Sequence, residues 1–540
     1  MKYSIAPLPR WEDLDGGEPI RVARHYRIPV GDDELLLLPH GRPGWLRLPA
    51  ALYPLLDSLD GTSVAAFTAW PGFPDAVGTL RALYEAGLVF VGGRTGVRAV
   101  PAPRATTPAT ATAPATAPDG AVAPGGAHAE AVGTEPPTAL LLKLTGACDI
   151  ACDYCYDYDS ERWPGRMPAE VARRLITECL VPGRALTLMF HGGEPLLRFG
   201  QIRELVEFAE LRAAEVGATV HFTVQTNGRH FTDDVVAFLR RHAFAVGVSL
   251  DGPQDINDRH RVDHRGRGTF ARIAENFDRF PEFMRHEVGY ISVVGTDTTP
   301  DELDRVWQFF RSMGVHSWKM LPADAEGRSG DKPETRQFRQ TFADFLGTRL
   351  GRILDGDLEP PYLTNLVQLI EPFLTVERPN MCMKMPCGAS DDLLVLDAVG
   401  SVRACDCSYH PAFQLLPRAA VSPPPGRTAL PIAGTSLTVR SRSTPSAAAL
   451  RDRERWLLDD APCASCPWLH QCAGTCPARA LINNGSLYSV DELECTTRLA
   501  LFPRVLEDVS RPGSVLRAYY ERAKSRAAAG AAGLSAAPPR

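Results

Sequence analysis

Three cysteines stand close together in the segment TGACDIACDYCYDYD, residues 145–159. Cys148, Cys152 and Cys155 follow the spacing C-x3-C-x2-C. A structural zinc ion normally takes four protein ligands, and a disulfide framework needs an even number of cysteines. A compact set of three thiols therefore predicts a metal site that leaves one coordination position open.

A second group of cysteines lies toward the C-terminus. All 13 cysteines of the chain lie at or after Cys148. The later group runs Cys463-x2-Cys466-x5-Cys472-x3-Cys476 with Cys495 after a gap, and it is preceded by Cys382, Cys387 and Cys405. Clustered cysteines in a reducing compartment indicate metal or redox chemistry, with zinc as the alternative because zinc ribbons use similar spacings. Cys179 and Cys407 fit no motif and are interpreted as a core thiol and an incidental thiol.

The composition is that of an ordinary soluble globular protein. The chain has 540 residues, 44% hydrophobic residues and a formal net charge of -6. It shows no basic stripe of the kind that nucleic-acid binding needs, and no apolar run near the ~18 residues of a membrane span. The first residues also lack the pattern of a signal peptide. These features favour a cytoplasmic protein with neither a nucleic-acid nor a membrane partner.

The elements that must position the first cysteines alternate in type from residue 139 onward. Six strand-like segments are each followed by a helix-like one; the strands are ALLLKLT, LTLMFHGG, HFTVQTNG, AVGVSLDG, VGYISVV and SWKMLP. Such alternation predicts parallel strands joined by right-handed crossovers. We therefore expect an α/β fold, a partial (β/α)6 TIM barrel over residues 138–350.

Unusual residues follow the first four predicted strands. The cysteine trio follows the first strand, HGGEP (191–195) ends the second, QTNG (225–228) the third and SLDGP (249–253) the fourth. Barrels of parallel strands carry their chemistry at the carboxyl ends of the strands. The sequence thus predicts that these segments meet in one site.

A separate small domain is predicted before the barrel. Residues 1–98 contain two strand patterns, helix patterns and a final strand pattern, which is typical of a winged-helix-like α+β domain, with Val77, Leu80, Leu83 and Tyr84 on one helical face. Residues 99–137 are rich in Ala, Pro and Thr and predict a flexible linker.

After the barrel we expect a cysteine-rich domain over residues 351–500 and a C-terminal helix with a disordered tail over 501–540. The disorder should begin at about Lys524. A segment of biased composition, residues 417–450, interrupts the cysteine-rich domain. Its LPIAGTSLTV patch could form a short strand or hairpin.

The trio, GGEP and SLDG motifs, in this order, make the chain resemble the radical S-adenosylmethionine (SAM) enzymes. The resemblance implies that Cys148, Cys152 and Cys155 hold three irons of a [4Fe-4S] cluster and that the fourth iron chelates SAM. In that family, reductive cleavage of SAM yields a 5'-deoxyadenosyl radical that abstracts a substrate hydrogen. The cofactor supplies the chemistry and the protein aims it.

The resemblance also implies contacts to SAM. The GGEP residues, whose glycines allow close approach and whose carboxylate suits an ammonium, would bind the methionine amino group. The full set is Tyr154 near the adenine, Gly192, Gly193, Glu194 and Pro195 at the amino group, Ser249 at the ribose, Arg261 at the carboxylate, and Gln225 and Asn227 as further contributors. For Gln225, Asn227 and Asp251 a purely structural turn is the alternative.

The later cysteines resemble the SPASM extension of radical SAM enzymes that modify peptides and proteins. By analogy with sulfatase-maturating enzymes they would hold two auxiliary [4Fe-4S] clusters. One would take Cys382, Cys387, Cys405 and Cys476, and the other Cys463, Cys466, Cys472 and Cys495. Such clusters could accept the electron left when a substrate radical forms a bond, or hold substrate at an open iron.

The strand and helix order of residues 1–98 is similar to that of precursor-peptide recognition domains, which bind a leader peptide as an added strand. We therefore expect a maturase of ribosomally made peptides that forms an oxidative crosslink, carbon to carbon or thioether, with flavodoxin or ferredoxin as reductant. Sulfatase maturation, in which a Cys or Ser becomes formylglycine, is the alternative, and peptide epimerisation is less favoured. A non-catalytic, zinc-dependent adaptor is the contrasting class.

Overall fold

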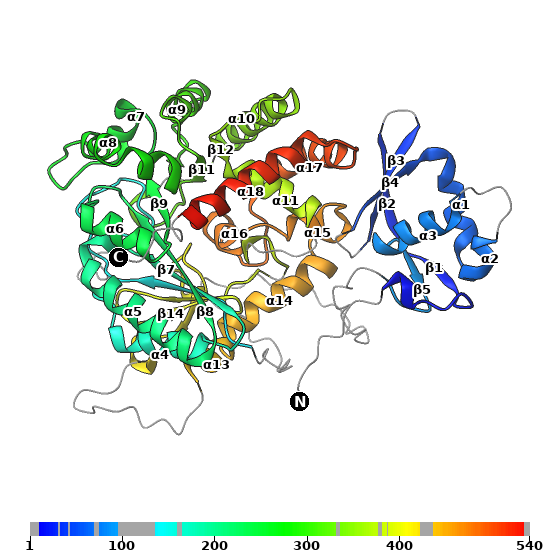
Figure 1. Cartoon of the computed structure of the whole chain (residues 1–540), viewed down its shortest axis with the longest axis horizontal. Coiled ribbons are helices and arrows are strands. Elements are labelled where there is room, and N and C mark those ends of the chain that lie inside the picture. The colour runs from blue at the N-terminus through cyan, green and yellow to red at the C-terminus, as the bar shows by residue number, and fades with distance from the viewer. Residues whose placement is uncertain are drawn as a thin grey trace. The chain divides into compact units, whose positions relative to one another are not determined.

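The computed structural model describes residues 10–30, 33–40, 44–69, 75–95, 135–158, 165–330, 335–375, 381–385, 387–421 and 436–533. These residues form two compact units, one of Met1–Arg27 with Leu36–Glu135 and the other of Ile28–Leu35 with Pro136–Arg540 (Figure 1). Most of the linker expected over residues 99–137 lies outside the described residues.

The N-terminal part contains five strands and three short helices among its described residues. They are β1 Ile20–Val22, β2 His25–Val30, β3 Glu34–Pro39, β4 Leu46–Pro49, α1 Tyr53–Leu59, α2 Val64–Thr68, α3 Ala76–Glu85 and β5 Val89–Val91. Strands β2, β3 and β4 form one sheet in that order, while β1 pairs with β5 antiparallel. The sequence anticipated β3, β4, the helices and β5 but missed β1 and β2.

Helix α3 differs in one respect from the predicted apolar face. Leu80, Leu83 and Tyr84 are buried as expected, but Val77 is 50% exposed. Ala76 is buried in its place. Val77 is three residues before Leu80 and seven before Tyr84, so it lies at the edge of the same face, in the first turn of the helix.

The second unit is built on a ten-stranded sheet in the order β12-β11-β10-β9-β8-β7-β6-β13-β14-β15. The strands are β6 Ala139–Lys143, β7 Ala185–His191, β8 Thr219–Thr226, β9 Ala245–Ser249, β10 Val288–Val294, β11 Ser317–Pro322, β12 Tyr362–Leu363, β13 Leu393–Leu396, β14 Val402–Arg403 and β15 Gln414–Leu416. Strands β6 to β12 are all parallel to their neighbours, and β13 joins β6 in parallel.

Helices alternate with these strands, as predicted. Those of the barrel are α4 Ala169–Cys179, α5 Phe199–Val216, α6 Asp233–Arg241, α7 Gln254–His260, α8 Phe270–Arg279 and α9 Pro300–Ser312 (Figure 1). Thr299 and Glu302 form a capping box at the start of α9, which fixes that boundary. The α/β core with its mostly parallel sheet confirms the expected partial barrel.

The C-terminal helices contact both the first and the last part of the barrel. They are α10 Arg336–Leu354, α11 Thr364–Leu374, α12 Arg418–Val421, α13 Leu437–Arg442, α14 Pro445–Asp459, α15 Leu469–Cys472, α16 Pro477–Asn484, α17 Glu492–Val509 and α18 Val515–Gly533. Helix α17 contacts α10 and α11, and α18 contacts all three. Both α10 and α17 run across the boundaries expected at residues 350 and 500.

The prediction of disorder after about Lys524 is wrong for residues 525–533, because helix α18 continues to Gly533. Its first turns are anchored: Leu516 and Tyr519 are buried, and the Tyr519 hydroxyl accepts a hydrogen bond from the Leu363 amide at 2.8 Å. The following residues are alanine-rich, and alanine readily extends a helix that is already nucleated.

The predicted strand or hairpin at LPIAGTSLTV also requires correction. Residues 430–435 lie outside the described residues, but Leu437–Arg442 form helix α13. The Glu178 carboxylate accepts hydrogen bonds from the Thr438 amide at 2.9 Å and the Ser436 hydroxyl at 2.5 Å. An acceptor at a helix N-terminus favours the helix, and this partner is remote in sequence.

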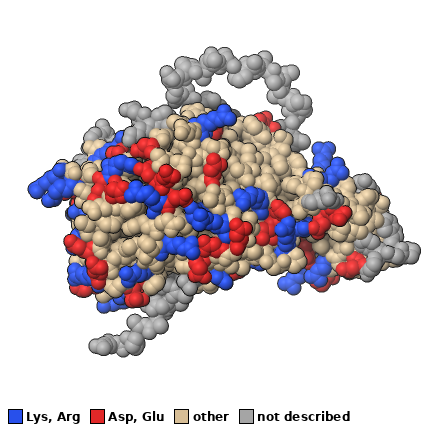
Figure 2. Space-filling model, turned by 90° about the horizontal axis from the view of Figure 1, so that it is seen from above, with Lys and Arg blue, Asp and Glu red and all other residues tan. Residues whose placement is uncertain are grey.

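No helix in the described ranges is long and apolar enough to cross a membrane. On the face that Figure 2 shows, Lys and Arg are interspersed with Asp and Glu. This mixture agrees with the modest formal net charge of -6.

Candidate active site

The carboxyl ends of the barrel strands open into a cavity of about 1000 Å³. Most of the predicted site residues line it: Cys148, Cys152, Tyr154, Cys155, Gly193, Gln225, Asn227, Ser249, Arg261, Cys382, Cys387, Cys405 and Cys476. Gly192, Glu194, Pro195, Cys463, Cys466, Cys472 and Cys495 do not line it. The cavity thus brings together the cysteine trio, most predicted SAM contacts and one of the two predicted auxiliary thiol sets.

The trio lies on the loop that follows β6. Burial raises the pKa of the Cys148 thiol, with a further contribution from the Glu194 carboxylate. Burial and the nearby Asp157 also raise the pKa of Cys155 to about 11. Thiols in such surroundings lose their protons when a bound cation compensates the charge. The raised pKa values argue against free nucleophilic thiols, and metal binding by this loop stays the prediction made from the cysteine spacing.

The two glycines after β7 are required by close backbone contacts. Gly193 has φ of +52°, and a Cβ there would lie 2.2 Å from the Ala147 carbonyl oxygen. Gly192 has φ of +82°, and its Cβ would lie 2.6 Å from that of Lys143. The loop carrying the thiols and the loop after β7 are thus in direct contact, which no larger residue would allow.

Glu194, predicted to bind the methionine amino group, is hydrogen-bonded within the protein. Its carboxylate is fully buried and accepts hydrogen bonds from the Asn227 amide at 2.7 Å, the Thr226 hydroxyl at 2.7 Å and the Leu196 amide at 3.0 Å. Burial raises its pKa, against these hydrogen bonds. Its carboxylate does not line the cavity and joins the ends of β7 and β8, and binding of the methionine amino group by the GGEP segment stays a prediction.

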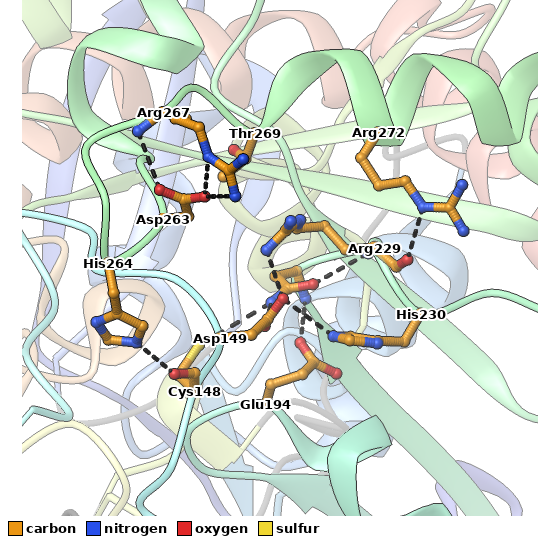
Figure 3. Close-up of polar contacts among 12 residues, drawn as sticks. Cys148, Asp149, Glu194, Arg229, His230, Asp263, His264, Arg267, Thr269 and Arg272 are labelled. Atoms are coloured by element: carbon orange, nitrogen blue, oxygen red, sulfur yellow. Dashed lines mark hydrogen bonds and ion pairs between the residues drawn. The ribbon is translucent and has the colours of Figure 1, made fainter.

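Asn227 connects the end of β8 to the cysteine loop through Asp149, which Figure 3 labels with its partners Arg229 and His230. Its Nδ2 donates to Asp149 Oδ1 at 2.7 Å and lies 4.0 Å from Cys148 Sγ. Asp149 also pairs with Arg229 at 2.5 Å and His230 at 3.1 Å. Burial opposes the ionisation of Asp149, but the His230 hydrogen bond lowers its pKa. His264 makes a second contact with the cysteine loop, since its Nε2 lies 2.8 Å from the Cys148 carbonyl oxygen.

Tyr154 and Arg261 contact each other beside the trio. Arg261 Nη1 donates to the Tyr154 hydroxyl at 2.8 Å, and that hydroxyl donates to Asp251 Oδ2 at 2.5 Å. Burial raises the pKa of Tyr154 well above its usual value. Arg261 Nε is buried without a hydrogen-bond partner within the described part of the chain. A buried donor at the cavity wall is suited to an anionic ligand group.

Ser249 and Gln225 lie side by side at the ends of β9 and β8. Gln225 Nε2 donates to Ser249 Oγ at 2.9 Å. Gly247 makes room for this side chain, since a Cβ there would lie 2.1 Å from Gln225 Oε1. Both residues thus keep the orientation that points them at the cavity.

The first auxiliary thiol set gathers on the side of the cavity formed by the C-terminal domain. Burial, followed by the charge of Cys382, raises the pKa of Cys387 to about 12. The hydrogen bond with Cys407 lowers the pKa of Cys405, but burial and the charges of Cys476, Cys387 and Cys382 raise it. Cys407, interpreted from sequence as incidental, lies in the same group, and its backbone amide donates to Cys405 Sγ at 3.5 Å.

The second set forms a separate group away from the cavity lining. Burial raises the pKa of Cys463 to about 12, and the next contributions come from Cys472, Cys466 and Cys495. Among the described residues, no three His, Cys, Asp or Glu side chains are arranged as ligands of a single metal ion.

A buried ion-pair network in the cavity wall was missed by the sequence interpretation. Lys143 is 1% exposed and pairs with Asp157 at 2.6 Å and with Asp406 at 2.7 Å. Burial disfavours the charged form of Lys143, but the charges of Asp157 and Asp406 raise its pKa well above the usual value. Conversely, Lys143 outweighs burial and lowers the pKa of Asp406 far below its usual range. The one sequence signal was a lysine within the otherwise apolar first strand.

Aromatic hydroxyls complete this network. Tyr156 donates to Asp406 Oδ2 at 2.8 Å and Tyr409 donates to Asp157 Oδ1 at 2.6 Å. The Lys143 ammonium also lies 4.3 Å from the centre of the Tyr409 ring, within cation–π range. Asp157 follows the cysteine trio and Asp406 stands between Cys405 and Cys407, so the network connects the two cysteine-bearing loops.

Comparisons with known proteins agree with this geometry. The family model of the Radical SAM superfamily matches residues 142–310. The mycofactocin maturase MftC of Mycolicibacterium smegmatis is 30% identical over 291 residues, which cover 52% of this chain and 67% of that protein. The chain belongs to the radical SAM superfamily. This radical SAM enzyme is also 27% identical over 285 residues to a serine-type anaerobic sulfatase-maturating enzyme of Klebsiella aerogenes, covering 50% of this chain and 67% of the relative.

A solved structure shares the fold of this radical SAM enzyme. Native anSMEcpe with bound AdoMet aligns with a TM-score of 0.56 at 20% identity, covering 68% of this chain and 98% of that one. At this identity the likeness concerns the fold.

The residues present suit the [4Fe-4S] cluster and SAM that membership of the superfamily implies. Three thiols on one loop leave one iron of a cluster without a protein ligand. The contact at Gly193 and the unpartnered Arg261 Nε provide close backbone approach and a cationic donor beside that loop, within the part of the chain that the structure describes. The donor set therefore fits these cofactors.

Proposed function

We propose that this radical SAM enzyme matures a ribosomally made precursor peptide by installing an oxidative crosslink, carbon to carbon or thioether, in its core. The observation that carries the proposal is the shared cavity: Cys148, Cys152 and Cys155 line it together with Cys382, Cys387, Cys405 and Cys476. A substrate group in that cavity would lie between a radical source and an electron acceptor, which an oxidative reaction needs.

Each predicted site residue has a role in this proposal. When bound, the reduced cluster and SAM supply a 5'-deoxyadenosyl radical that takes a hydrogen atom from the substrate. Cys148, Cys152 and Cys155 would hold that cluster, and the Gly193 backbone, Tyr154, Ser249 and Arg261 would orient SAM. The two auxiliary thiol sets would hold two further [4Fe-4S] clusters, and a flavodoxin or ferredoxin would supply electrons.

The chain also offers groups to accept the proton that the substrate loses. Asp406 lines the cavity, but its ion pair with Lys143 lowers its basicity. His191 lines the cavity at the end of β7, and its Nδ1 is buried without a hydrogen-bond partner in the described ranges. A buried, unpaired imidazole nitrogen is the better acceptor of the two.

Residues 1–98 would bind the leader segment of the precursor as an added strand. The order β2-β3-β4 leaves β2 and β4 as the outer strands of the described sheet, and outer strands present backbone groups for pairing. Pro29 within β2 and Pro49 at the end of β4 lack an amide donor, which limits the register in which a peptide could pair. We therefore propose this winged-helix-like domain as the leader-binding part.

Sulfatase maturation is the second candidate, favoured by the similarity to the Klebsiella aerogenes enzyme. The similarity to the mycofactocin maturase favours a small peptide substrate. Both reactions are oxidations of a protein or peptide side chain, and both would use the same cavity. The proposed leader-binding role of the N-terminal domain supports the precursor peptide, because a protein substrate already folded needs no leader-binding strand.

The decisive experiment incubates the reconstituted enzyme anaerobically with SAM, a reductant and candidate precursor peptides from reading frames beside its gene. We expect the peptide to lose two hydrogen atoms per crosslink while 5'-deoxyadenosine forms. An unchanged mass with deuterium uptake from heavy water would indicate epimerisation instead. Deoxyadenosine release with no change in any peptide would contradict the proposal and favour a sulfatase-like substrate.

A further inference from the structure

Arg498 contacts a thiol of the second auxiliary set directly. It lies on α17, one turn after Cys495, and is 8% exposed. Its Nη1 donates to the Cys472 carbonyl oxygen at 2.5 Å and lies 3.1 Å from Cys472 Sγ. A guanidinium is permanently charged, so this sulfur has a cationic donor against it.

The same side chain extends toward the first set. Arg498 Nη2 pairs with Glu494 Oε2 at 2.9 Å, and that carboxylate oxygen accepts the Cys476 amide at 3.1 Å. Nη2 also lies 3.7 Å from the sulfur of Met383, the residue after Cys382. Arg498 and Glu494 both line the cavity. The pair thus lies between the two thiol sets, but Arg498 donates to a thiol of the second set.

A second buried arginine shows that this contact is selective. Arg453 is 3% exposed. Burial lowers the pKa of its guanidinium, and the charges of thiols of both sets oppose that shift. Its guanidinium donates to the carbonyl oxygens of Leu487 at 2.7 Å and of Gly474 and Ser489 at 2.8 Å. These bonds go to three backbone segments and none of them goes to a thiol, whereas Arg498 donates to one carbonyl oxygen and to a thiol sulfur.

Hydrogen bonds to ligand sulfurs and the local charge set the reduction potential of an iron–sulfur cluster. Reduction adds one negative charge, and a cationic N–H donor on a ligand sulfur stabilises that charge. We propose that Arg498 raises the reduction potential of the cluster held by Cys463, Cys466, Cys472 and Cys495. This inference rests on the proposed assignment of that cluster.

The test is a redox titration of the full-length, anaerobically reconstituted enzyme, followed by electron paramagnetic resonance. The midpoint that disappears in Cys463→Ser/Cys466→Ser identifies the second auxiliary cluster. In Arg498→Met we expect this midpoint potential to fall by at least about 59 mV, which corresponds to a tenfold change in the equilibrium of a one-electron reduction. In Arg498→Lys the midpoint potential should fall less, because lysine keeps the positive charge but lacks the planar set of N–H donors of arginine.

Arg504→Met is the matched control, because Arg504 is an exposed arginine on the same helix and donates to the Gly347 carbonyl oxygen at 3.0 Å. Its three midpoints should equal those of the unmodified enzyme. Because Arg498→Met leaves Glu494 without its partner, Arg498→Met/Glu494→Gln repeats the measurement without that unpaired charge.

Two results would overturn the inference. An unmoved second midpoint in both Arg498→Met variants at full iron content, or an equal shift of all three midpoints, would refute the role of Arg498 while leaving the proposed function intact. Fewer than the ~12 irons per chain of three clusters in the unmodified enzyme, with no second auxiliary signal, would refute both this inference and the cluster assignment.

Discussion

At the residue scale, the chemistry of the site depends on charges that are buried in pairs. Lys143 holds Asp157 and Asp406 within 2.7 Å, and Arg498 holds Glu494 at 2.9 Å. Removing one partner of a buried pair leaves an uncompensated charge, which costs more than the pair itself contributes. Such residues are therefore expected to affect stability as well as reactivity.

Lys143→Met should destabilise the fold by roughly 3–5 kcal/mol, because two carboxylates lose their buried partner. Denaturant unfolding of the reconstituted enzyme measures this. Lys143→Met/Asp157→Asn/Asp406→Asn should recover part of the loss. The matched control is Lys384→Met, since Lys384 pairs with Asp392 at 2.8 Å at a side-chain exposure of 36%, and a pair of this kind contributes about 0–1 kcal/mol. Equal losses for Lys143→Met and Lys384→Met would contradict the prediction.

Asp324 predicts a pH dependence of stability. Burial raises its pKa to about 6, although Arg479 opposes the shift, compared with about 3.9 in an unfolded chain. The folded state therefore binds more protons between these values, and the stability gained on protonation is present at low pH and lost as pH rises through 6. Relative to Asp324→Asn, the unmodified enzyme should be less stable at pH 7 than at pH 5 in urea titrations. If the unmodified enzyme gained stability relative to Asp324→Asn between pH 5 and pH 7, the prediction would be refuted.

Much of the site could be predicted from residues that are close in sequence, and the rest could not. The cysteine spacings and the GGEP segment are local patterns, and the structure brings most of them into one cavity. Asp406 contacts Lys143 from a position 263 residues later, a pairing that no local pattern encodes. The hydrogen bonds of Glu194 with Thr226 and Asn227 could not be predicted, because these residues become its neighbours only once β7 and β8 are paired.

At the element scale, the parallel strands determine which loops meet. Strands β6 and β7 pair so that Lys143 lies opposite His191, which places the cysteine loop directly against the two glycines after β7. Strand and helix order was predictable because period-two and helical patterns alternate clearly from residue 139. Strands β12 to β15 were missed because they are only two to four residues long.

Gly193→Ala should separate the cysteine loop from the loop after β7. A Cβ at Gly193 would lie 2.2 Å from a backbone oxygen, and its φ of +52° is unfavourable for alanine. We expect weaker SAM binding, measured by equilibrium dialysis, and a lower iron content. Gly200→Ala in helix α5 is the control, because nothing lies within 4 Å of its added Cβ among the described residues. Similar losses in both variants would show that the contact at Gly193 is unimportant.

At the scale of the whole molecule, the chain divides into two compact units with the cavity entirely in the second. All predicted cluster ligands and SAM contacts belong to that second unit. Cofactor chemistry and leader binding are thus expected to be separable functions.

An enzyme of residues 135–540 should retain its iron and its production of 5'-deoxyadenosine, but should modify dilute precursor poorly. Covalent connection of two binding parts raises apparent affinity by about 10²–10⁴. Supplying residues 1–98 as a separate chain should restore only a fraction of the rate, as measured by mass spectrometry of the precursor. Full activity of the shortened enzyme on dilute precursor would refute leader binding by the N-terminal domain.

The size of the cavity has a consequence for the order of events in catalysis. About 1000 Å³ lies near the upper limit of pockets for a single small molecule, yet this cavity would have to accommodate SAM and part of a peptide. Spent 5'-deoxyadenosine and methionine would then have to leave before fresh SAM enters, and a peptide bound in the same cavity would block their exit. A precursor with several modification sites would accordingly dissociate between turnovers, so singly modified intermediates should accumulate: the enzyme would be distributive rather than processive.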